Sequence, residues 1–89
     1  RRSSDLNRES GFGRYDVMLE PFDKSKTAYI LEFKVHNPRT EDSLEDTVSK
    51  ALLQIDEKNY DAELIADGFR KEQICHFGFA FEGKHVLIG

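Results

Sequence analysis

The spacing of hydrophobic and polar positions predicts a β-hairpin in the first part of the chain. Strand-forming residues fill 15–20, which Pro21 ends, and a second run of such residues fills 27–35. The polar residues 23–26 lie between the two runs and are typical of a turn. We therefore expect the two strands to pair as neighbours in one sheet.

The hydrophobic period changes after this hairpin. From Ser43 apolar residues recur at helical spacing, which predicts a long amphipathic helix over 43–59. A short second helix is expected over 60–67, because Gly68 is a favoured helix stop. Strands over 74–81 and 85–88 follow. The order of two strands, two helices and two strands predicts an α/β fold.

Composition narrows the class of protein. The chain has 89 residues, of which 38% are hydrophobic and 34% are charged, as expected for a single globular domain spanning 1–89. No segment approaches the ~18 consecutive apolar residues of a membrane span, so we expect no membrane insertion. A single cysteine, Cys75, excludes an internal disulfide and a cysteine-based zinc site, which favours a reducing cytoplasm. Because the only methionine is Met18, we expect this chain to be part of a longer protein.

The charge is negative overall and unevenly spread. A net charge of −4 disfavours strong non-specific binding to nucleic acid by this domain alone. Nine of the acids lie within 41–67, and we expect them to form a solvated helix face.

Two charged residues interrupt the hydrophobic run of the second predicted strand. Side chains two apart in a strand share a face, so Ile30, Glu32 and Lys34 point one way. Burying either charge alone would cost several kcal/mol. Glu32 and Lys34 must therefore lie at a sheet edge, pair with each other, or hold a ligand.

Asp16 on the preceding strand brings a second carboxylate to the same end of the hairpin. Two carboxylates ~4 Å apart repel by about 4 kcal/mol at an effective dielectric near 20, and a divalent cation between them removes that cost. Hard oxygen ligands suit Mg²⁺ or Mn²⁺, with Lys34 as a positive charge beside the ion. The spacing of Glu32 and Lys34 is weak as a motif, because Glu82 and Lys84 repeat it on a glycine turn. From these residues alone, a surface ion-pair cluster at the hairpin end remains the alternative.

Three stretches together make the motif more specific. "GRYDVML", "YILEFKV" and "ALLQIDEKNYDAEL", with the closing "FGFAFEGK", resemble the PD-(D/E)XK nuclease superfamily from about Leu6 to the C-terminus. In detail they resemble bacterial members in which this domain follows an AAA-ATPase-like domain. The resemblance implies a restriction-endonuclease-like mixed sheet with a long covering helix. It also implies a truncated domain, with the N-terminal helix of the core missing from this chain.

The same resemblance implies roles for individual residues. The metal ligands of the family fall on Asp16, on Glu32 and on the carbonyl of Phe33, and the catalytic lysine falls on Lys34. Gln54 takes the position of a helix glutamine that touches the lysine or the substrate backbone. Mg²⁺ or Mn²⁺ is the implied cofactor.

The implied function is metal-dependent hydrolysis of phosphodiester bonds in nucleic acid, with DNA favoured over RNA, by a cytoplasmic enzyme. An AAA-ATPase-like domain in the same parent polypeptide is the implied partner. The alternative is a non-catalytic module that keeps the fold and serves a partner ATPase or grips nucleic acid. A structural piece of a larger machine is a third possibility.

Several residues near the site have two interpretations. Gln54 and Lys58 share one side of the long helix, where they either support the site or form its polar margin. His36 lies on the face of Glu32 and either reaches a metal or phosphate or is plain surface. Glu9 is a further acid that the chain could bring near the site.

The remaining aromatic residues have a structural interpretation. Tyr60 is expected in the hydrophobic core. The alternating residues of the third strand are expected there too: Cys75, Phe77, Phe79 and Phe81.

Overall fold

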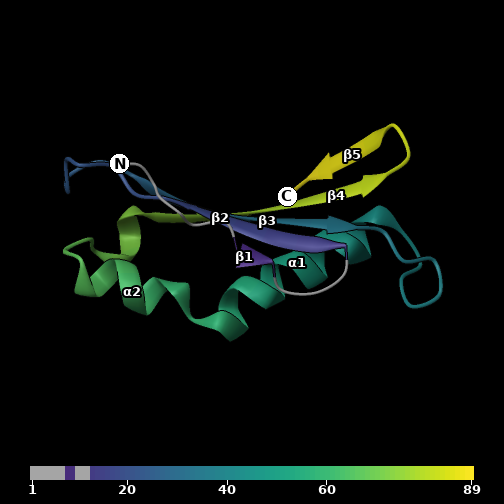
Figure 1. Ribbon diagram of the computed structural model, residues 1–89, viewed down its shortest axis with the longest axis horizontal. Coiled ribbons are helices and arrows are strands. Elements are labelled where there is room, and N and C mark those ends of the chain that lie inside the picture. Colours follow the sequence, from purple (N-terminus) through teal and green to yellow (C-terminus); the bar gives the residue numbers. More distant parts are fainter. Residues whose placement is uncertain (1–7, 10–12) are drawn as a thin grey trace.

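The computed structural model describes the backbone of residues 8–9 and 13–89 and the side chains of residues 13–89. The elements form an elongated body of 40 × 22 × 21 Å (Figure 1). The strands are β1 (Arg8–Glu9), β2 (Arg14–Leu19), β3 (Ala28–Val35), β4 (Ile74–Glu82) and β5 (His85–Ile88). The helices are α1 (Leu44–Lys58), α2 (Tyr60–Ala66) and the short 3₁₀ helix η1 (Lys71–Gln73). None of the described helices is long and apolar enough to cross a membrane.

The strands form one mixed sheet in the order β1-β2-β3-β4-β5. β2 and β3 pair as the antiparallel hairpin that the sequence predicts, with Asp16 opposite Glu32. β4 lies on the other side of β3 and runs parallel to it. A parallel pair needs a long crossover connection, which α1 and α2 supply. β3 is therefore an internal strand, with a neighbour on each side.

The helix boundaries follow from local capping. The side chain of Ser43 accepts a hydrogen bond from the backbone N–H of Asp46 at 3.4 Å and begins α1. Asn59 ends it in a left-handed conformation with φ 56°, and α2 starts at the next residue. Both helices match the predicted ranges to within a residue.

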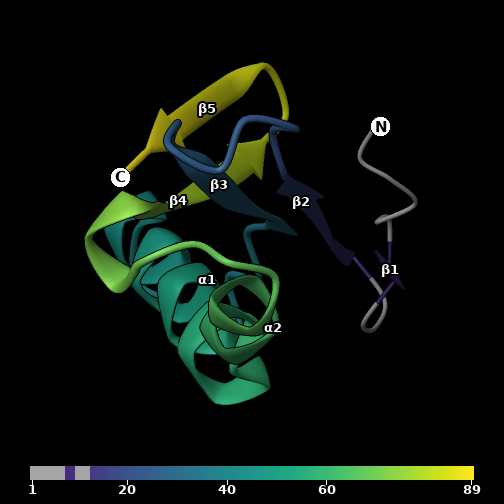
Figure 2. The same ribbon diagram turned by 90° about the vertical axis from the view of Figure 1, so that its left-hand side faces the viewer.

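α1 and α2 cover one face of the sheet (Figure 2). Ala28, Ile30 and Glu32, which alternate along β3, are all 0% exposed on this face. The core between sheet and helices includes Tyr60, as predicted. Its buried members are Met18, Ala28, Ile30, Ile55, Tyr60, Leu64 and Phe69.

The alternating residues of β4 do not lie in the core as predicted. They form a stripe along one face of the strand: Cys75, Phe77, Phe79 and Phe81. The stripe shares a face with the register partners Tyr29, Leu31, Phe33 and Val35, and α1 and α2 lie on the opposite face (Figure 2). Phe77 is 36% exposed, and the ring of Phe79 stacks on Phe33 with 4.8 Å between centroids. Alternation correctly places these side chains on one face, but it does not say which face the helices cover.

Candidate active site

Asp16 and Glu32 form a cross-strand pair in the middle of the sheet. They are direct register partners on β2 and β3, and only 2% and 0% of their surfaces are exposed. Side chains directly opposite each other in antiparallel strands have neighbouring Cβ atoms on one face. Two of the alternatives that the sequence left open, a sheet-edge position and a surface ion-pair cluster, are therefore wrong, because both carboxylates are buried beneath the helices.

Lys58 and Tyr60 reach this pair from the junction of α1 and α2. The ammonium of Lys58 donates to Asp16 Oδ2 at 2.7 Å and lies 3.7 Å from Glu32 Oε1. The hydroxyl of Tyr60 donates to the same Asp16 oxygen at 2.8 Å. The left-handed residue Asn59 separates the two and turns the chain between them. The helix junction thus supplies a charge and a hydrogen-bond donor to one carboxylate.

Glu32 lacks comparable partners. Neither carboxylate oxygen has a hydrogen-bond partner among the described residues, because the Lys58 ammonium is beyond hydrogen-bond length. Burial raises the pKa of Glu32, and the nearby Lys58 charge opposes that rise. A fully buried carboxylate without hydrogen bonds is uncommon in folded proteins and needs a specific explanation.

The donor set of this pair fits a hard divalent cation. Two neighbouring carboxylates, one with unpartnered oxygens, offer the ligands that Mg²⁺ and Mn²⁺ prefer. The described residues contain no cluster of three or more His, Cys, Asp or Glu side chains at ligand spacing. A metal here would therefore depend on Asp16 and Glu32, with main-chain or water oxygens completing its shell.

Lys34 follows Glu32 on the same face but pairs with Glu41. Its ammonium donates to Glu41 Oε2 at 2.6 Å, and its side chain is 13% exposed. Glu41 also accepts from the backbone N–H of Asn37 at 2.7 Å and from the hydroxyl of Thr47 at 2.8 Å. Burial would raise the pKa of Glu41, but these hydrogen bonds outweigh it and lower the pKa to about 2. Glu41 is thus an ionised, buried partner that fixes the end of Lys34.

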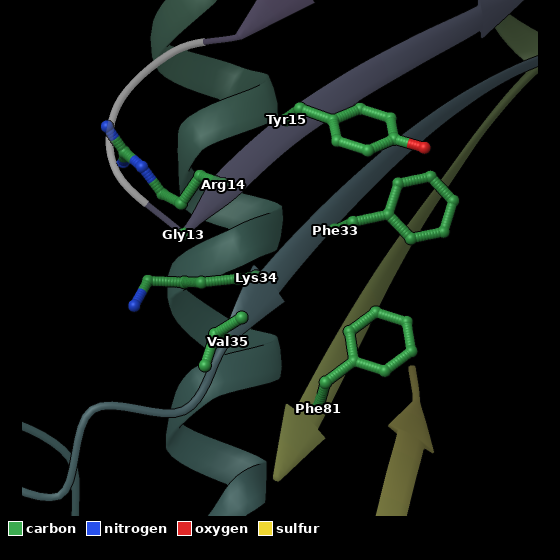
Figure 3. A pocket seen from close by; sticks show the side chains of 7 residues that line it. All are labelled: Gly13, Arg14, Tyr15, Phe33, Lys34, Val35 and Phe81. Atoms are coloured by element: carbon green, nitrogen blue, oxygen red, sulfur yellow. The ribbon is translucent and has the colours of Figure 1, made fainter. Parts of the chain in front are cut away.

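A pocket of about 440 Å³ opens beside Lys34. Figure 3 shows Arg14 and Lys34 on one side of it, and the rings of Tyr15, Phe33 and Phe81 on the other. Asp16 and Glu32 do not line it. Of Asp16, Glu32 and Lys34, only Lys34 lines this pocket.

A family model of the PD-(D/E)XK nuclease superfamily matches residues 4–89. The chain belongs to this superfamily. Its members are typically nucleases that use divalent metals. The α/β fold, a mixed sheet covered by two helices, agrees with the restriction-endonuclease-like fold of the superfamily. Searches of curated proteins and of solved structures give no significant match.

The covered face of the sheet carries Asp16, Glu32 and Lys34, the residues to which the resemblance assigns the acids and the lysine, whereas Gln54 has a different partner. Its side-chain amide donates to Glu57 at 3.2 Å, whereas Lys34 binds Glu41. Among the described residues Gln54 and Lys34 thus have different hydrogen-bond partners, and a contact between them stays a prediction. A contact between Gln54 and substrate remains a prediction. Four residues further along α1, Lys58 reaches the motif acids instead.

Three further residues had expected roles: His36 and Glu41 differ from them, and the side chain of Glu9 is not described by the structure. The side chain of His36 is 6% exposed and lies 2.8 Å from the hydroxyl of Thr47, so its interpretation as plain surface is wrong. Glu41 is 3% exposed, although the acids of its stretch were expected on a solvated face. The side chain of Glu9 lies outside the described part of the chain.

The role of Glu41 was not predicted from the sequence, and the contacts of Lys58 and Tyr60 with Asp16 were not predicted either. Glu41 precedes the helix cap, in a loop whose course the hydrophobic pattern does not predict. Lys58 and Tyr60 carried a signal, because both belong to the "QIDEKNY" stretch that supports the superfamily resemblance.

Proposed function

We propose that this domain is a metal-dependent nuclease that hydrolyses phosphodiester bonds in nucleic acid, with DNA as the favoured substrate. The observation that carries the proposal is the buried pair of Asp16 and Glu32, in which the Glu32 oxygens have no hydrogen-bond partner among the described residues. Membership of the nuclease superfamily gives this pair its chemical meaning.

Asp16, Glu32 and the carbonyl of Phe33 would hold the Mg²⁺ or Mn²⁺ ion. When bound, such an ion activates a water molecule and neutralises negative charge on the phosphate. Lys34 orients the water or stabilises the transition state as a point charge. Glu41 acts on Lys34 as a positioning residue through their contact of 2.6 Å. Gln54 is proposed to contact the substrate backbone.

The wider setting of the domain is also a proposal. The resemblance to bacterial members supports a cytoplasmic protein in which an AAA-ATPase-like domain belongs to the same polypeptide. On this view residues 1–89 form one domain of that larger protein.

A non-catalytic module is the second candidate function, and one observation favours it. The Lys58 ammonium already lies 2.7 Å from Asp16 and 3.7 Å from Glu32, where it compensates their charge without a metal. Such a module would keep the fold and bind a partner or nucleic acid. It requires no affinity for Mn²⁺ at this pair, and a metal titration separates the two functions.

The test of the nuclease proposal is a cleavage assay of the full-length protein with Mn²⁺ or Mg²⁺ on single- and double-stranded DNA and RNA. We expect Asp16→Asn, Glu32→Gln and Lys34→Ala each to lower the cleavage rate by about 10²-fold or more, because each removes a ligand or a stabilising charge. Glu45→Gln and Lys71→Ala are the controls, since both residues are exposed and away from the pair. Unchanged cleavage in all three site variants would rule out the assignment.

A further inference from the structure

Lys58 is the only described cation within 4 Å of both motif carboxylates. Its ammonium lies 2.7 Å from Asp16 Oδ2 and 3.7 Å from Glu32 Oε1. A metal ion shared by the two acids would have to lie close to both of them, in the same region as this ammonium. Two cations cannot occupy neighbouring positions there without strong repulsion in a site removed from water.

Because the two acids are buried, their negative charges need a positively charged partner. The side chains of Asp16 and Glu32 are 3% and 0% exposed, and buried carboxylates without a positive partner are strongly destabilising. Lys58 supplies one positive charge to two carboxylates, and no group in the described part of the chain donates a hydrogen bond to Glu32. The Lys58 ammonium thus compensates the negative charge of the pair, and the Glu32 oxygens are still available as metal ligands.

Lys58 is also placed so that it can leave. It lies in the last turn of α1, and its side chain is 21% exposed, whereas the acids are held by the sheet. A lysine side chain has four rotatable carbon–carbon links, so its ammonium can reach solvent while the backbone stays in place. Tyr60 would keep its hydrogen bond of 2.8 Å to Asp16 during this exchange.

We propose that Lys58 is a built-in counter-cation that a divalent metal ion must displace from the Asp16–Glu32 pair. Without metal, Lys58 holds the two carboxylates in place. With metal, its ammonium moves to the solvent-exposed margin of α1. The inference rests on the metal site of the proposed function and adds a competitor to it.

The test measures Mn²⁺ binding by calorimetry on the full-length protein without nucleic acid. Lys58→Met and Lys58→Gln remove the competing charge, so we expect both to bind Mn²⁺ about ten-fold more tightly than the wild type, an effect of the size that groups around metal sites commonly have. Lys58→Gln keeps a hydrogen-bond donor for Asp16, which supports folding if the methionine variant is unstable. Lys58→Arg keeps the charge and should retain wild-type affinity.

Lys71→Met is the matched control, because it makes the same charge change at a side chain that is 79% exposed. Thermal melting gives a second readout. Without metal, Lys58→Met should melt below the wild type, and saturating Mn²⁺ should raise its melting temperature by more than it raises that of the wild type.

The outcomes separate the two claims. Equal or weaker Mn²⁺ binding by both neutral variants would overturn the competition by Lys58 and leave the metal site standing. An absence of Mn²⁺ binding in the wild type and in all variants would overturn the metal site of the proposed function, and the competition with it.

Discussion

Glu41 determines where the ammonium of Lys34 lies, and its removal is the sharpest test among single residues. Glu41→Gln removes the charge that holds Lys34 at 2.6 Å but keeps the size of the side chain. Because hydrogen bonds to charged groups contribute about 1.5–3 kcal/mol, we expect the free energy of unfolding to fall by about 2 kcal/mol. Urea unfolding measures this loss, and cleavage should fall with it because Lys34 is no longer fixed. Glu45→Gln, at an exposed position, should change stability by less than about 0.5 kcal/mol.

The same variant predicts a pH dependence with a definite sign. The pKa of Glu41 is lowered from 4.5 to about 2 in the folded protein, so its contribution is complete above pH 4.5 and is lost as the pH falls towards 2. Glutamine does not titrate. The stability difference between wild type and Glu41→Gln should therefore shrink between pH 4.5 and pH 2. A difference that stays constant over this range would contradict the assignment of Glu41 as an ionised partner of Lys34.

Individual residues also show what the sequence could reveal about the site. Asp16 and Glu32 were predictable because strand alternation and hairpin pairing fix their face, and the structure confirms that they are opposite each other. The partners of the charged residues were not predictable. Glu41 reaches Lys34 through a loop, and Lys58 reaches Asp16 across 42 residues of sequence. Such contacts depend on tertiary packing, which local patterns do not encode.

Among the elements, α1 can close over the site because β4 has no side chain at Gly78. A Cβ atom there would lie 3.0 Å from the carbonyl oxygen of Val48 and 3.1 Å from the Cβ of Ala51. Gly78 is the β4 register partner of Glu32, so the close approach of α1 occurs beside the carboxylate pair.

Gly78→Ala tests this close approach. The added methyl group must push α1 away from β4, because a backbone oxygen cannot move out of its way alone. We expect the free energy of unfolding to fall by about 1–3 kcal/mol, as for other overpacked cores, and Mn²⁺ affinity to fall as well. Chemical denaturation and calorimetry check the two effects. A fully stable Gly78→Ala protein would show that α1 does not need this contact.

Element boundaries and pairing were the most predictable part of the fold. The period of apolar residues predicted α1, the stop at Gly68 predicted α2, and the polar turn at 23–26 predicted the hairpin, because these signals are local. The covered face was not predictable. The phenylalanines of β4 and the buried positions of β3 show the same alternation, and only the position of α1 and α2 distinguishes the two faces.

On the scale of the whole molecule, the mixed sheet brings the site together from two distant parts of the chain. The β2–β3 hairpin supplies the acids, and the crossover through α1 and α2 returns Lys58 and Tyr60 to them. The net charge of −4 leaves the domain with little general attraction to nucleic acid. If the proposed metal binds, the charges of the lysines and of the metal at the site therefore matter more for substrate contact than the overall charge.

A crystal structure determined with Mn²⁺, with anomalous diffraction measured at the manganese edge, tests the central claim most directly. We expect one anomalous peak between Asp16 and Glu32, about 2.0–2.3 Å from an oxygen of each, with the Lys58 ammonium displaced towards solvent. The same peak should be absent in Glu32→Gln. If no peak appears at this pair and Lys58 is still bound to Asp16, the pair is not a metal site.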